Sequence, residues 1–470
     1  MSRPTILWIR KEFRLADNPA LAEALAGNGP VIPVFILDPA MEETLGAAGQ
    51  WRLGQAIAAF TQTLESKGQR LILRRGDALE TLRALITETG ATRVVWGRHY
   101  DKAARDRDTD VKAALDDGGI EAVSVCAHLL FEPWTIETKT GGPYRVYSPF
   151  KRACFEREEE IGDPLPAPDD LAAPDDWPES ESLADWALGA AMNRGGDIVA
   201  QYANVGEAAA LERLEEFVPI VSEYDEGRNA LGITGTSRLS ENYAWGDIST
   251  RTAWHRIRSY MARSSKSDDG PIVYLQELLW REFAYHLLFH YPDLASENWR
   301  EEWNAFPWRE DNDDAERWRR GETGIAGVDA AMRELYATGY MHNRMRMLTA
   351  SFLTKHLMTD WRVGEAWFRE CLTDWDPASN AMGWQWVAGS GPDATPFFRI
   401  FNPETQVEKF DRENRYVSRW LDADSEDAQN FFAAIPRSWE MSGDDARPDP
   451  VIGLKEGRER ALAAYKDMKG

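Results

Sequence analysis

A short stretch in the second half of the chain combines acidic, amide and indole side chains. It reads DWDPASNAMGWQW and contains Asp374, Asp376, Asn380, Trp384 and Trp386. Asn380 and Trp384 are four residues apart, so on a helix they project from one face. Carboxylates and an amide beside indoles suit hydrogen bonding and stacking on a flat heteroaromatic ligand. The alternative is a buried aromatic helix end, because tryptophan is mostly buried in proteins.

The hexapeptide GTSRLS, residues 235–240, has the composition of an anion-binding turn. It supplies Thr236, Ser237, Arg238, Leu239 and Ser240, and Tyr224 precedes it. Hydroxyls, backbone N–H groups beside a glycine and a guanidinium just ahead of a helix can hold a diphosphate. Serine and threonine before a helix are also ordinary caps, so simple capping is the alternative.

A further cluster, QELLWREF, spans residues 276–283. It places Glu277, Trp280 and Arg281 at positions i, i+3 and i+4 of one helical face. A carboxyl, an indole and a guanidinium side by side can hydrogen-bond, stack on and neutralise a nucleotide. The alternative is an amphipathic helix that carries an ordinary surface ion pair.

The segment GYMHNRMRM, residues 339–347, adds more polar groups at helical spacing. Asn343 and Met347 share a face, and we expect Arg344 to reach a carboxylate such as Asp374. Such an Arg–Asp pair would fix the wall of a pocket.

Glu282, His286 and His290 follow one another at four-residue spacing, which is a spacing that metal ligands also use. The chain has neither the H-E-x-x-H arrangement nor a nearby cysteine there, so we predict no metal site and a solvated or core-edge stripe instead.

Composition predicts a water-soluble, multidomain protein. The 470 residues suffice for two or three domains, and 43% of them are hydrophobic while 28% are charged. No apolar run approaches a membrane span and the first residues lack a secretory signal. The three cysteines are too few and too scattered for a disulfide framework. We therefore expect a cytoplasmic protein.

The formal net charge of −24 argues against broad affinity for nucleic acid. It does not exclude a local basic rim around a pocket. The 20 tryptophans are unusual and indicate either a helical core or stacking and electron-carrying groups.

Short apolar runs alternate with helical spacing over about the first 130 residues. The predicted strands are 5–10, 31–37, 70–74, 93–96 and 122–125, with helices at 51–67, 79–89 and 101–115 between them. Asn18 followed by Pro19 predicts a capped helix start. This alternation predicts a doubly wound parallel sheet. No G-x-G-x-x-G follows the first strand, so a dinucleotide site there has little support.

The remaining chain divides into a connector and a larger helical part. We expect an α/β domain over residues 1–132, a connector rich in proline and acidic residues over 133–205, and an all-α domain over 206–470. Helices are predicted at 207–224, 250–261, 273–290, 326–338, 342–356 and 364–371.

Six segments, in their order along nearly the whole chain, resemble the photolyase/cryptochrome family: LWIRKEFRLADNPAL, GTSRLS, ELLWREF, GYMHNRMRM, GWQWVAGSGPDA and FRIFNPETQ. The chain is most similar to bacterial photolyases that repair cyclobutane pyrimidine dimers. GGPYRVYSPF, residues 141–150, resembles their classes I and III, and the choice between these classes stays open.

The resemblance implies an α/β antenna domain and a helical domain that binds a U-shaped FAD, with the reduced anion as active form. It implies a FAD-binding set of Tyr224, Thr236, Ser237, Arg238, Leu239, Ser240, Asn343, Arg344, Asp374, Asp376 and Asn380, with Asn380 facing flavin N5. It implies a lesion pocket of Glu277, Trp280, Asn343, Met347 and Trp386. It implies Arg228, Arg281 and Arg399 at the rim facing DNA phosphates, and an electron relay through Trp384, Trp361 and Trp308.

The implied activity is light-driven electron transfer from reduced FAD to a flipped-out dimer in UV-damaged DNA. We hypothesise that Glu277 is protonated and hydrogen-bonds the dimer. The alternative activity is that of a cryptochrome, a blue-light receptor that binds FAD without repair. Asn380 favours repair, because plant-type cryptochromes carry an acid there.

The resemblance leaves the antenna chromophore open. Folate-binding members carry an Asn-Glu pair where a gapless comparison puts Ala103 and Ala104. Folate in another position, deazaflavin, FMN or no antenna remain alternatives. We expect a monomer that is associated with the nucleoid when it is bound to DNA, and the sequence leaves its preference for single- or double-stranded DNA open.

Overall fold

A five-stranded parallel sheet covered by helices lies between Thr5 and Val125. The computed structural model describes residues 3–27, 29–394 and 396–469. The strands lie in the order β3-β2-β1-β4-β5, with bounds Thr5–Ile9 (β1), Val31–Leu37 (β2), Ile72–Arg75 (β3), Arg93–Gly97 (β4) and Glu121–Val125 (β5). Every residue of β1 and β2 is buried, as expected for strands covered on both faces. The predicted doubly wound sheet is confirmed.

The helices of this part connect successive strands. They are α1 Pro19–Leu25, α2 Pro39–Thr44, α3 Ala47–Glu65, α4 Ala78–Thr89 and α5 Lys102–Asp117. Asn18 caps α1 as predicted, since its side chain accepts a hydrogen bond of 3.0 Å from Leu21 N. Ala103 and Ala104 lie in the first turn of α5.

The segment between the two halves is only partly irregular. It contains α6 Tyr147–Glu156, α7 Gly195–Val199 and the short 3-10 turns η1 Glu158–Ile161, η2 Leu183–Trp186 and η3 Ala190–Met192. Between them the chain runs back along the sheet, where Val31 N donates to Ala172 O at 3.1 Å and Glu181 N donates to Leu73 O at 2.9 Å.

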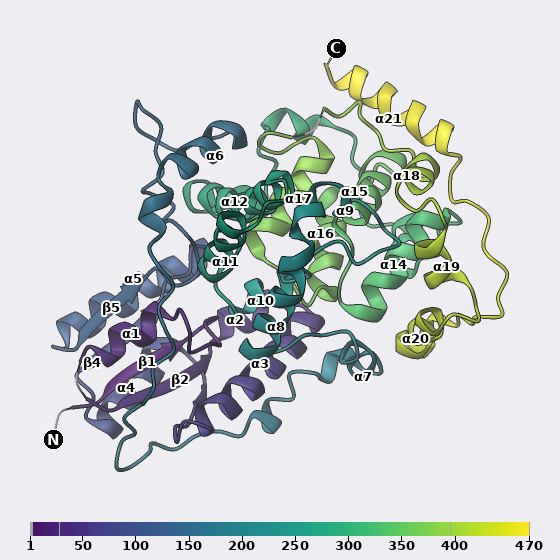
Figure 1. The fold of residues 1–470 in the computed structure, drawn as a ribbon. Coiled ribbons are helices and arrows are strands. Elements are labelled where there is room, and N and C mark those ends of the chain that lie inside the picture. Colours follow the sequence, from purple (N-terminus) through teal and green to yellow (C-terminus); the bar gives the residue numbers. More distant parts are fainter. Residues whose placement is uncertain (1–2, 28, 395, 470) are drawn as a thin grey trace.

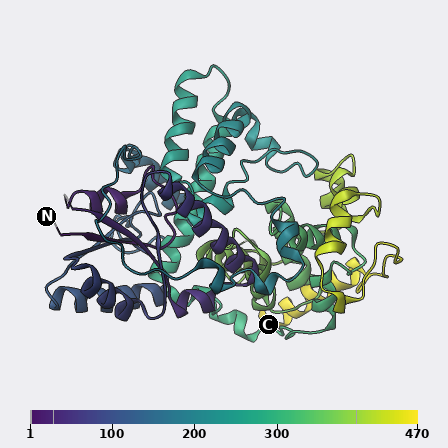
Figure 2. The ribbon, with the colours of Figure 1, turned by 90° about the horizontal axis from the view of Figure 1, so that it is seen from below.

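The remaining residues form the helical half, which lies beside the sheet-containing half (Figures 1 and 2). Its helices are α8 Glu207–Phe217, α9 Tyr224–Gly227, α10 Ser240–Trp245, α11 Thr250–Arg263, α12 Asp269–His290, α13 Asp313–Arg320, α14 Ala326–Thr338, α15 Asn343–Ser351, α16 Trp361–Cys371, α17 Pro377–Ala388, α18 Pro403–Phe410, α19 Arg415–Leu421, α20 Glu426–Ala434 and α21 Leu454–Lys469. Short 3-10 turns occur at η4 Val218–Glu223, η5 Pro292–Ala295, η6 Glu301–Ala305 and η8 Arg437–Trp439. The prediction of a helical second half is confirmed.

Two predicted helices differ from those in the structure. The helix expected over 207–224 ends at Phe217 and continues as the 3-10 turn η4, which contains Pro219. The helix expected over 342–356 ends as the π-helical turn η7, Phe352–His356. A π-turn leaves no periodicity signal that distinguishes it from an α-helix over five residues.

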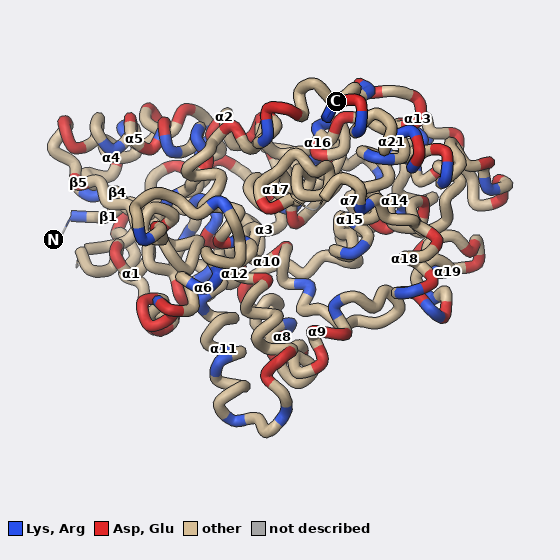
Figure 3. The backbone as a smooth tube through the Cα atoms, turned by 90° about the horizontal axis from the view of Figure 1, so that it is seen from above, with Lys and Arg blue, Asp and Glu red and all other residues tan. Residues whose placement is uncertain are grey.

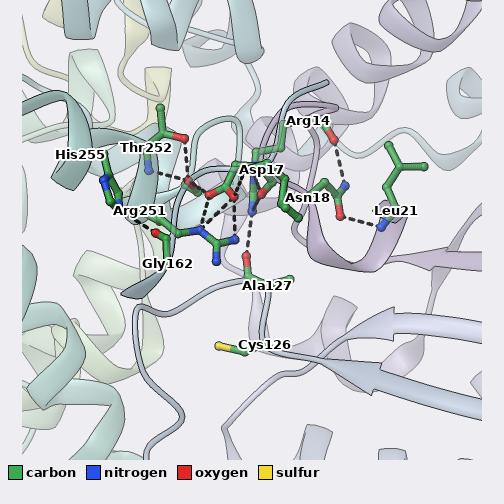
Figure 4. A network of polar contacts seen from close by, with 12 residues as sticks. Arg14, Asp17, Asn18, Leu21, Cys126, Ala127, Gly162, Arg251, Thr252 and His255 are labelled. Atoms are coloured by element: carbon green, nitrogen blue, oxygen red, sulfur yellow. Dashed lines mark hydrogen bonds and ion pairs between the residues drawn. The ribbon is translucent and has the colours of Figure 1, made fainter. Parts of the chain in front are cut away.

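The two halves are joined by buried charged groups. Asp17, 1% exposed, accepts hydrogen bonds from Ser249 and Arg251 of the helical half (Figure 4). Burial would raise the pKa of Asp17, but these bonds hold it below its ordinary value. Arg14 donates to Gly246 O at 2.9 Å and to Ala127 O at 2.8 Å.

Arg52 of α3 is a second link between the halves. Its side chain is fully buried and pairs with Glu241 and Asp247, which lie in and just after α10. Among the described residues, no helix is long and apolar enough to span a bilayer.

Candidate functional site

A cavity of about 180 Å³ lies between α15, α16 and α17. Its wall includes Asn343, Met347, Asp374, Asp376, Asn380 and Trp384, six of the residues that the sequence singled out. The helix α17 begins at Pro377, with the Asp376 carboxylate accepting from Ser379 N at 2.7 Å as its cap. Asn380 and Trp384 therefore sit one turn apart, as predicted.

The arginine that pairs with Asp374 is Arg346 and not Arg344. Arg346 Nη2 donates to Asp374 Oδ2 at 2.7 Å, whereas Arg344 donates to Asn229 Oδ1 and stacks on Phe410. Residues two apart on a helix point in roughly opposite directions. The expected Arg344–Asp374 pair is therefore wrong, and Arg346, which also lines the cavity, was missed.

The second carboxylate oxygen of Asp374 is buried and accepts no hydrogen bond from the described residues. Asp374 Oδ1 has no hydrogen-bond partner among the described residues, and the side chain is 1% exposed. An unpaired buried acceptor is costly unless a ligand supplies the donor. The imide N–H of an isoalloxazine ring has the required chemistry, so this wall fits a flavin.

Asp376 and Asn380 are oriented by neighbouring side chains. Tyr285 Oη donates to Asp376 Oδ2 at 2.5 Å, and Asn380 Nδ2 donates to Glu365 Oε1 at 3.0 Å. Burial raises the pKa of Glu365 despite the nearby Arg369. Tyr285 and Glu365 carried no motif signal, since they approach the cavity from other helices.

Trp384 packs directly against the backbone of α16. A Cβ atom on Gly364 would lie 2.1 Å from the Trp384 ring, so only glycine fits there. Trp361, three residues before Gly364, is fully buried and donates from Nε1 to Asn298 Oδ1 at 2.9 Å. Trp308 is half-buried, with its ring centroid 6.0 Å from that of Trp303. The indoles thus range from the cavity wall to the surface.

The GTSRLS turn lies at the start of α10, as expected, and partly lines a second cavity of about 170 Å³. Thr236 and Arg238 share this cavity with Arg415 and Arg419, two arginines that sequence reasoning missed. Ser237 and Leu239 are buried, Ser240 is exposed and is the first residue of α10, and Tyr224 is buried against Tyr274. Glu334 also lines this cavity, and Arg415 and Arg419 already pair with Glu413 and Asp427. The hydroxyls, the N–H groups and Arg238 are therefore the groups that suit a diphosphate.

Glu277 and Trp280 on α12 are each held by a neighbour. Arg228, the residue after α9, forms an ion pair with Glu277. Burial raises the pKa of Glu277, and Arg228 opposes that shift. Tyr147 stacks on Trp280 with ring centroids 3.5 Å apart. Trp280 is half-buried while Tyr147 is 5% exposed, so Tyr147 covers the inner face of the indole.

Arg281 does not lie at the rim. Its side chain is 11% exposed, and Nη1 donates to His128 O at 2.9 Å. The expectation that it faces DNA is corrected. Arg281 belongs to the contact between the halves, since its partner His128 lies 153 residues earlier in the chain. Arg399 is exposed and Trp386 is half-buried, as positions at a rim require.

Glu282 binds the end of the α/β domain, and His286 binds the connector. Glu282 Oε2 accepts from Leu130 N at 2.9 Å, and His286 Nε2 accepts from Tyr144 N at 3.0 Å. Burial raises the pKa of Glu282 to about 7 and lowers that of His286 to about 4. Both side chains are buried, unlike the solvated stripe expected as one alternative. In the described ranges no group of three potential ligands could hold a metal ion.

Known DNA photolyases match this chain along nearly its whole length. The family described as DNA photolyase matches residues 5–169, and the FAD binding domain of DNA photolyase matches residues 274–467. A deoxyribodipyrimidine photo-lyase of Agrobacterium fabrum is 44% identical, with 99% of this chain and 98% of that protein covered. One of Halobacterium salinarum is 35% identical, with 99% of each covered.

Solved structures of photolyases and a cryptochrome also match the chain. A class III photolyase from Agrobacterium tumefaciens has a TM-score of 0.91 and 43% identity, covering 100% of this chain and 98% of that one. A cryptochrome of Synechocystis has a TM-score of 0.83 and 26% identity, with 99% of each chain covered. An archaeal photolyase from Sulfolobus tokodaii with two FAD molecules has a TM-score of 0.74 and 25% identity, covering 99% of this chain and 100% of that one.

Proposed function

The chain belongs to the DNA photolyase family, and from this premise we propose that it is a deoxyribodipyrimidine photo-lyase of class III. It binds UV-damaged DNA and uses blue light to split cyclobutane pyrimidine dimers. FAD, bound in the helical half, supplies the electron for this reaction when it is reduced and excited. The chain's own residues hold the cofactor and the lesion and exclude water.

The observation that carries the proposal is the combination of Asp374 and Asn380 in one cavity wall. The open Oδ1 of Asp374 fits the imide N–H of a flavin. Asn380 offers a neutral amide, which can bond to flavin N5 without adding negative charge. A neutral neighbour favours a reduced flavin anion, the form that repair needs.

Lesion binding is assigned to residues around α12 and α17. Photolyases in general flip the damaged bases out of the duplex, and a damaged pair lowers the cost of flipping. Trp280 and Trp386 offer aromatic faces, each worth about 1–3 kcal/mol per stacked base. Glu277 and Met347 complete the pocket, and Arg399 and Arg228 contact phosphates.

Local basic groups offset the acidic surface near this pocket. Lys151 and Arg152 of α6 line a groove beside Gln276 of α12, and basic positions also occur along α11 (Figure 3). Because few phosphates meet such groups, we expect only a modest salt dependence of binding.

Trp308, Trp361 and Trp384 would form the relay between the protein surface and a bound flavin in this proposal. The half-buried, fully buried and cavity-lining positions of these indoles support that order. The domain bounds 1–132, 133–205 and 206–470 separate the antenna half, the connector and this catalytic half.

A second chromophore, either folate, deazaflavin or FMN, is assigned to the antenna half. The archaeal structure implicates a novel light-harvesting cofactor in that protein. We also propose that the protein acts as a monomer in the cytoplasm, at the nucleoid when bound to DNA. The absorption spectrum of the purified protein above 370 nm, compared with that of FAD extracted from it, tests for the second chromophore.

The competing function is that of a blue-light receptor, which the similarity to the Synechocystis cryptochrome favours. The deciding experiment gives reduced, FAD-loaded protein an oligonucleotide with one thymine dimer, in blue light and in darkness. Recovery of thymine absorbance only in light is the expected result. A dimer that stays intact in light, together with photoreduction of the flavin in a separate, oxidised sample of the same protein, would identify a receptor instead.

A further inference from the structure

Two residues assigned to different parts of the substrate are paired with each other in the free protein. Arg228 Nη1 contacts Glu277 Oε1, although Arg228 is assigned to a DNA phosphate and Glu277 to the dimer. Their side chains are 28% and 30% exposed, so solvent and an incoming strand reach both. Neither residue can serve its assigned partner fully while this pair persists.

A second guanidinium, that of Arg344, lies near Arg228. Arg344, on α15, is close enough to Arg228 that burial and then the Arg228 charge lower the pKa of Arg344. Arg344 donates to the neutral Asn229 side chain rather than to a carboxylate. A phosphate that meets Arg228 would therefore add negative charge beside two neighbouring guanidiniums.

The other groups that face Glu277 are phenols. Tyr224 of α9 and Tyr147 of α6 are both influenced by the Glu277 charge, and burial raises the pKa of both hydroxyls. They remain neutral near pH 7. Arg228 is therefore the cation that opposes the effect of burial on the pKa of Glu277.

Building on the proposed function, we infer that Arg228 is an exchangeable partner, which holds the Glu277 carboxylate in the free protein and moves to a DNA phosphate when a flipped dimer enters. Glu277 then loses its cation while the dimer displaces water around it. It takes up one proton from solvent and, as a neutral acid, donates a hydrogen bond to a dimer carbonyl. The proton comes from buffer, and no electron or co-reactant is needed for this step.

The energetics favour such an exchange. A partly exposed ion pair contributes little because solvent screens it, so it is readily given up. An arginine–phosphate contact is bidentate and charge-assisted, so the new partner is at least as good. A carboxyl left without its cation in a desolvated place is expected to bind a proton.

Proton uptake on binding is the quantity to measure. Calorimetric titrations of FAD-loaded protein in the dark, at one pH near 7 in buffers of different ionisation enthalpy, report protons taken up per complex. We expect about one proton more for an oligonucleotide with a thymine dimer than for the same undamaged oligonucleotide. Arg228→Met should show a smaller uptake than the wild type, because loss of the cation raises the pKa of Glu277 before binding.

Three further variants test whether the proton uptake depends on the Arg228–Glu277 pair. Arg228→Lys keeps the charge and should keep the uptake, and Glu277→Gln should abolish it. Arg258→Met is the matched control, since Arg258 forms a pair of similar exposure, 30% and 31%, with Glu158. Its uptake should equal that of the wild type.

The outcomes separate the exchange from the overall function. Dimer binding and light-driven repair without proton uptake would overturn the exchange alone. An uptake in a folded Arg228→Met variant that equals that of the wild type would also overturn it. Failure to bind or repair the dimer would overturn both the exchange and the photo-lyase assignment.

Discussion

The Tyr147 ring lies parallel to the indole of Trp280, with an angle of 11° between the planes. Tyr147 is also tied to its surroundings, since Oη donates to Gln276 O at 2.6 Å and N donates to Asp393 Oδ2 at 3.2 Å. The first residue of α6 thereby fixes an indole on α12 and the loop that follows α17.

Replacing this ring should weaken lesion binding. Tyr147→Leu keeps apolar volume but removes a stacked pair worth about 0.5–1.5 kcal/mol, so dimer affinity should fall by roughly 2- to 12-fold. Tyr147→Phe keeps the ring and should bind nearly as well as the wild type. The measurement is the dissociation constant for a dimer-containing oligonucleotide, and equal affinity of the Leu variant would refute the supporting role.

Arg346 and Arg344 should differ in their importance for the cofactor. Arg346→Met leaves Asp374 buried without its cation, so we expect a loss of about 3 kcal/mol in stability and poor FAD retention. Arg344→Met removes a guanidinium that has a neutral partner, and it should retain FAD. Flavin content per protein and urea unfolding measure both effects, and equal loss in the two variants would contradict the assignment.

Asp17 should stabilise the contact between the halves in a pH-dependent way. Its pKa is lowered in the folded protein from 3.8, so its contribution is present above about pH 4 and is lost as pH falls further. Asp17→Asn should cost about 3 kcal/mol at pH 7. The difference between variant and wild type in urea unfolding should stay constant from pH 8 to 5 and shrink below about pH 4. A constant difference down to pH 3 would argue against a charge effect.

Lys355 should make the protein more stable at alkaline pH. This residue of the π-turn is fully buried, its Nζ donates to Arg399 O at 3.2 Å, and burial lowers its pKa from 10.5 to about 7. Between these values the unfolded chain holds a proton that the folded chain lacks, so stability rises with pH by up to about 1.4 kcal/mol per unit.

Lys355→Met should remove this rise, as measured by unfolding at pH 7, 8 and 9. The exposed Lys455 provides the control, because Lys455→Met should leave the pH dependence unchanged. A wild-type slope that survives in Lys355→Met would assign the rise to another group.

Trp361 should matter for photoreduction but not for repair by protein that is already reduced. Trp361→Phe keeps an aromatic ring in the core while raising the cost of oxidising it. We expect flavin photoreduction to slow by at least about tenfold, with dimer repair after chemical reduction unchanged. Transient absorption of the flavin and the repair assay separate these two outcomes, and unimpaired photoreduction would exclude Trp361 from the relay.

The sequence predicts local features of this fold well. The all-apolar run 31–37 coincides with β2, and Asn18-Pro19 marks the start of α1, since each signal lies within a few residues. The cavity wall from Asp374 to Trp384 was likewise predicted, because its residues lie within eleven positions of one another at the start of α17.

Predictions failed where orientation depends on distant partners. Whether Arg344 or Arg346 faces Asp374 depends on how α15 is rotated against the segment before α17, which no local spacing encodes. Arg281 turns to His128, a residue from the other half, and Tyr147 reaches Trp280 from the connector. These contacts form only when the whole chain packs.

The buried Arg52 restricts how this protein can be recombined with its relatives. Its guanidinium belongs to the sheet-containing half, but its carboxylate partners, Glu241 and Asp247, belong to the helical half. A chimera that exchanged one half without matching these three residues would bury a charge without its counterpart, which typically costs several kcal/mol. Exchange of the antenna half between relatives is therefore expected to succeed only when Arg52 and its two acids are inherited together.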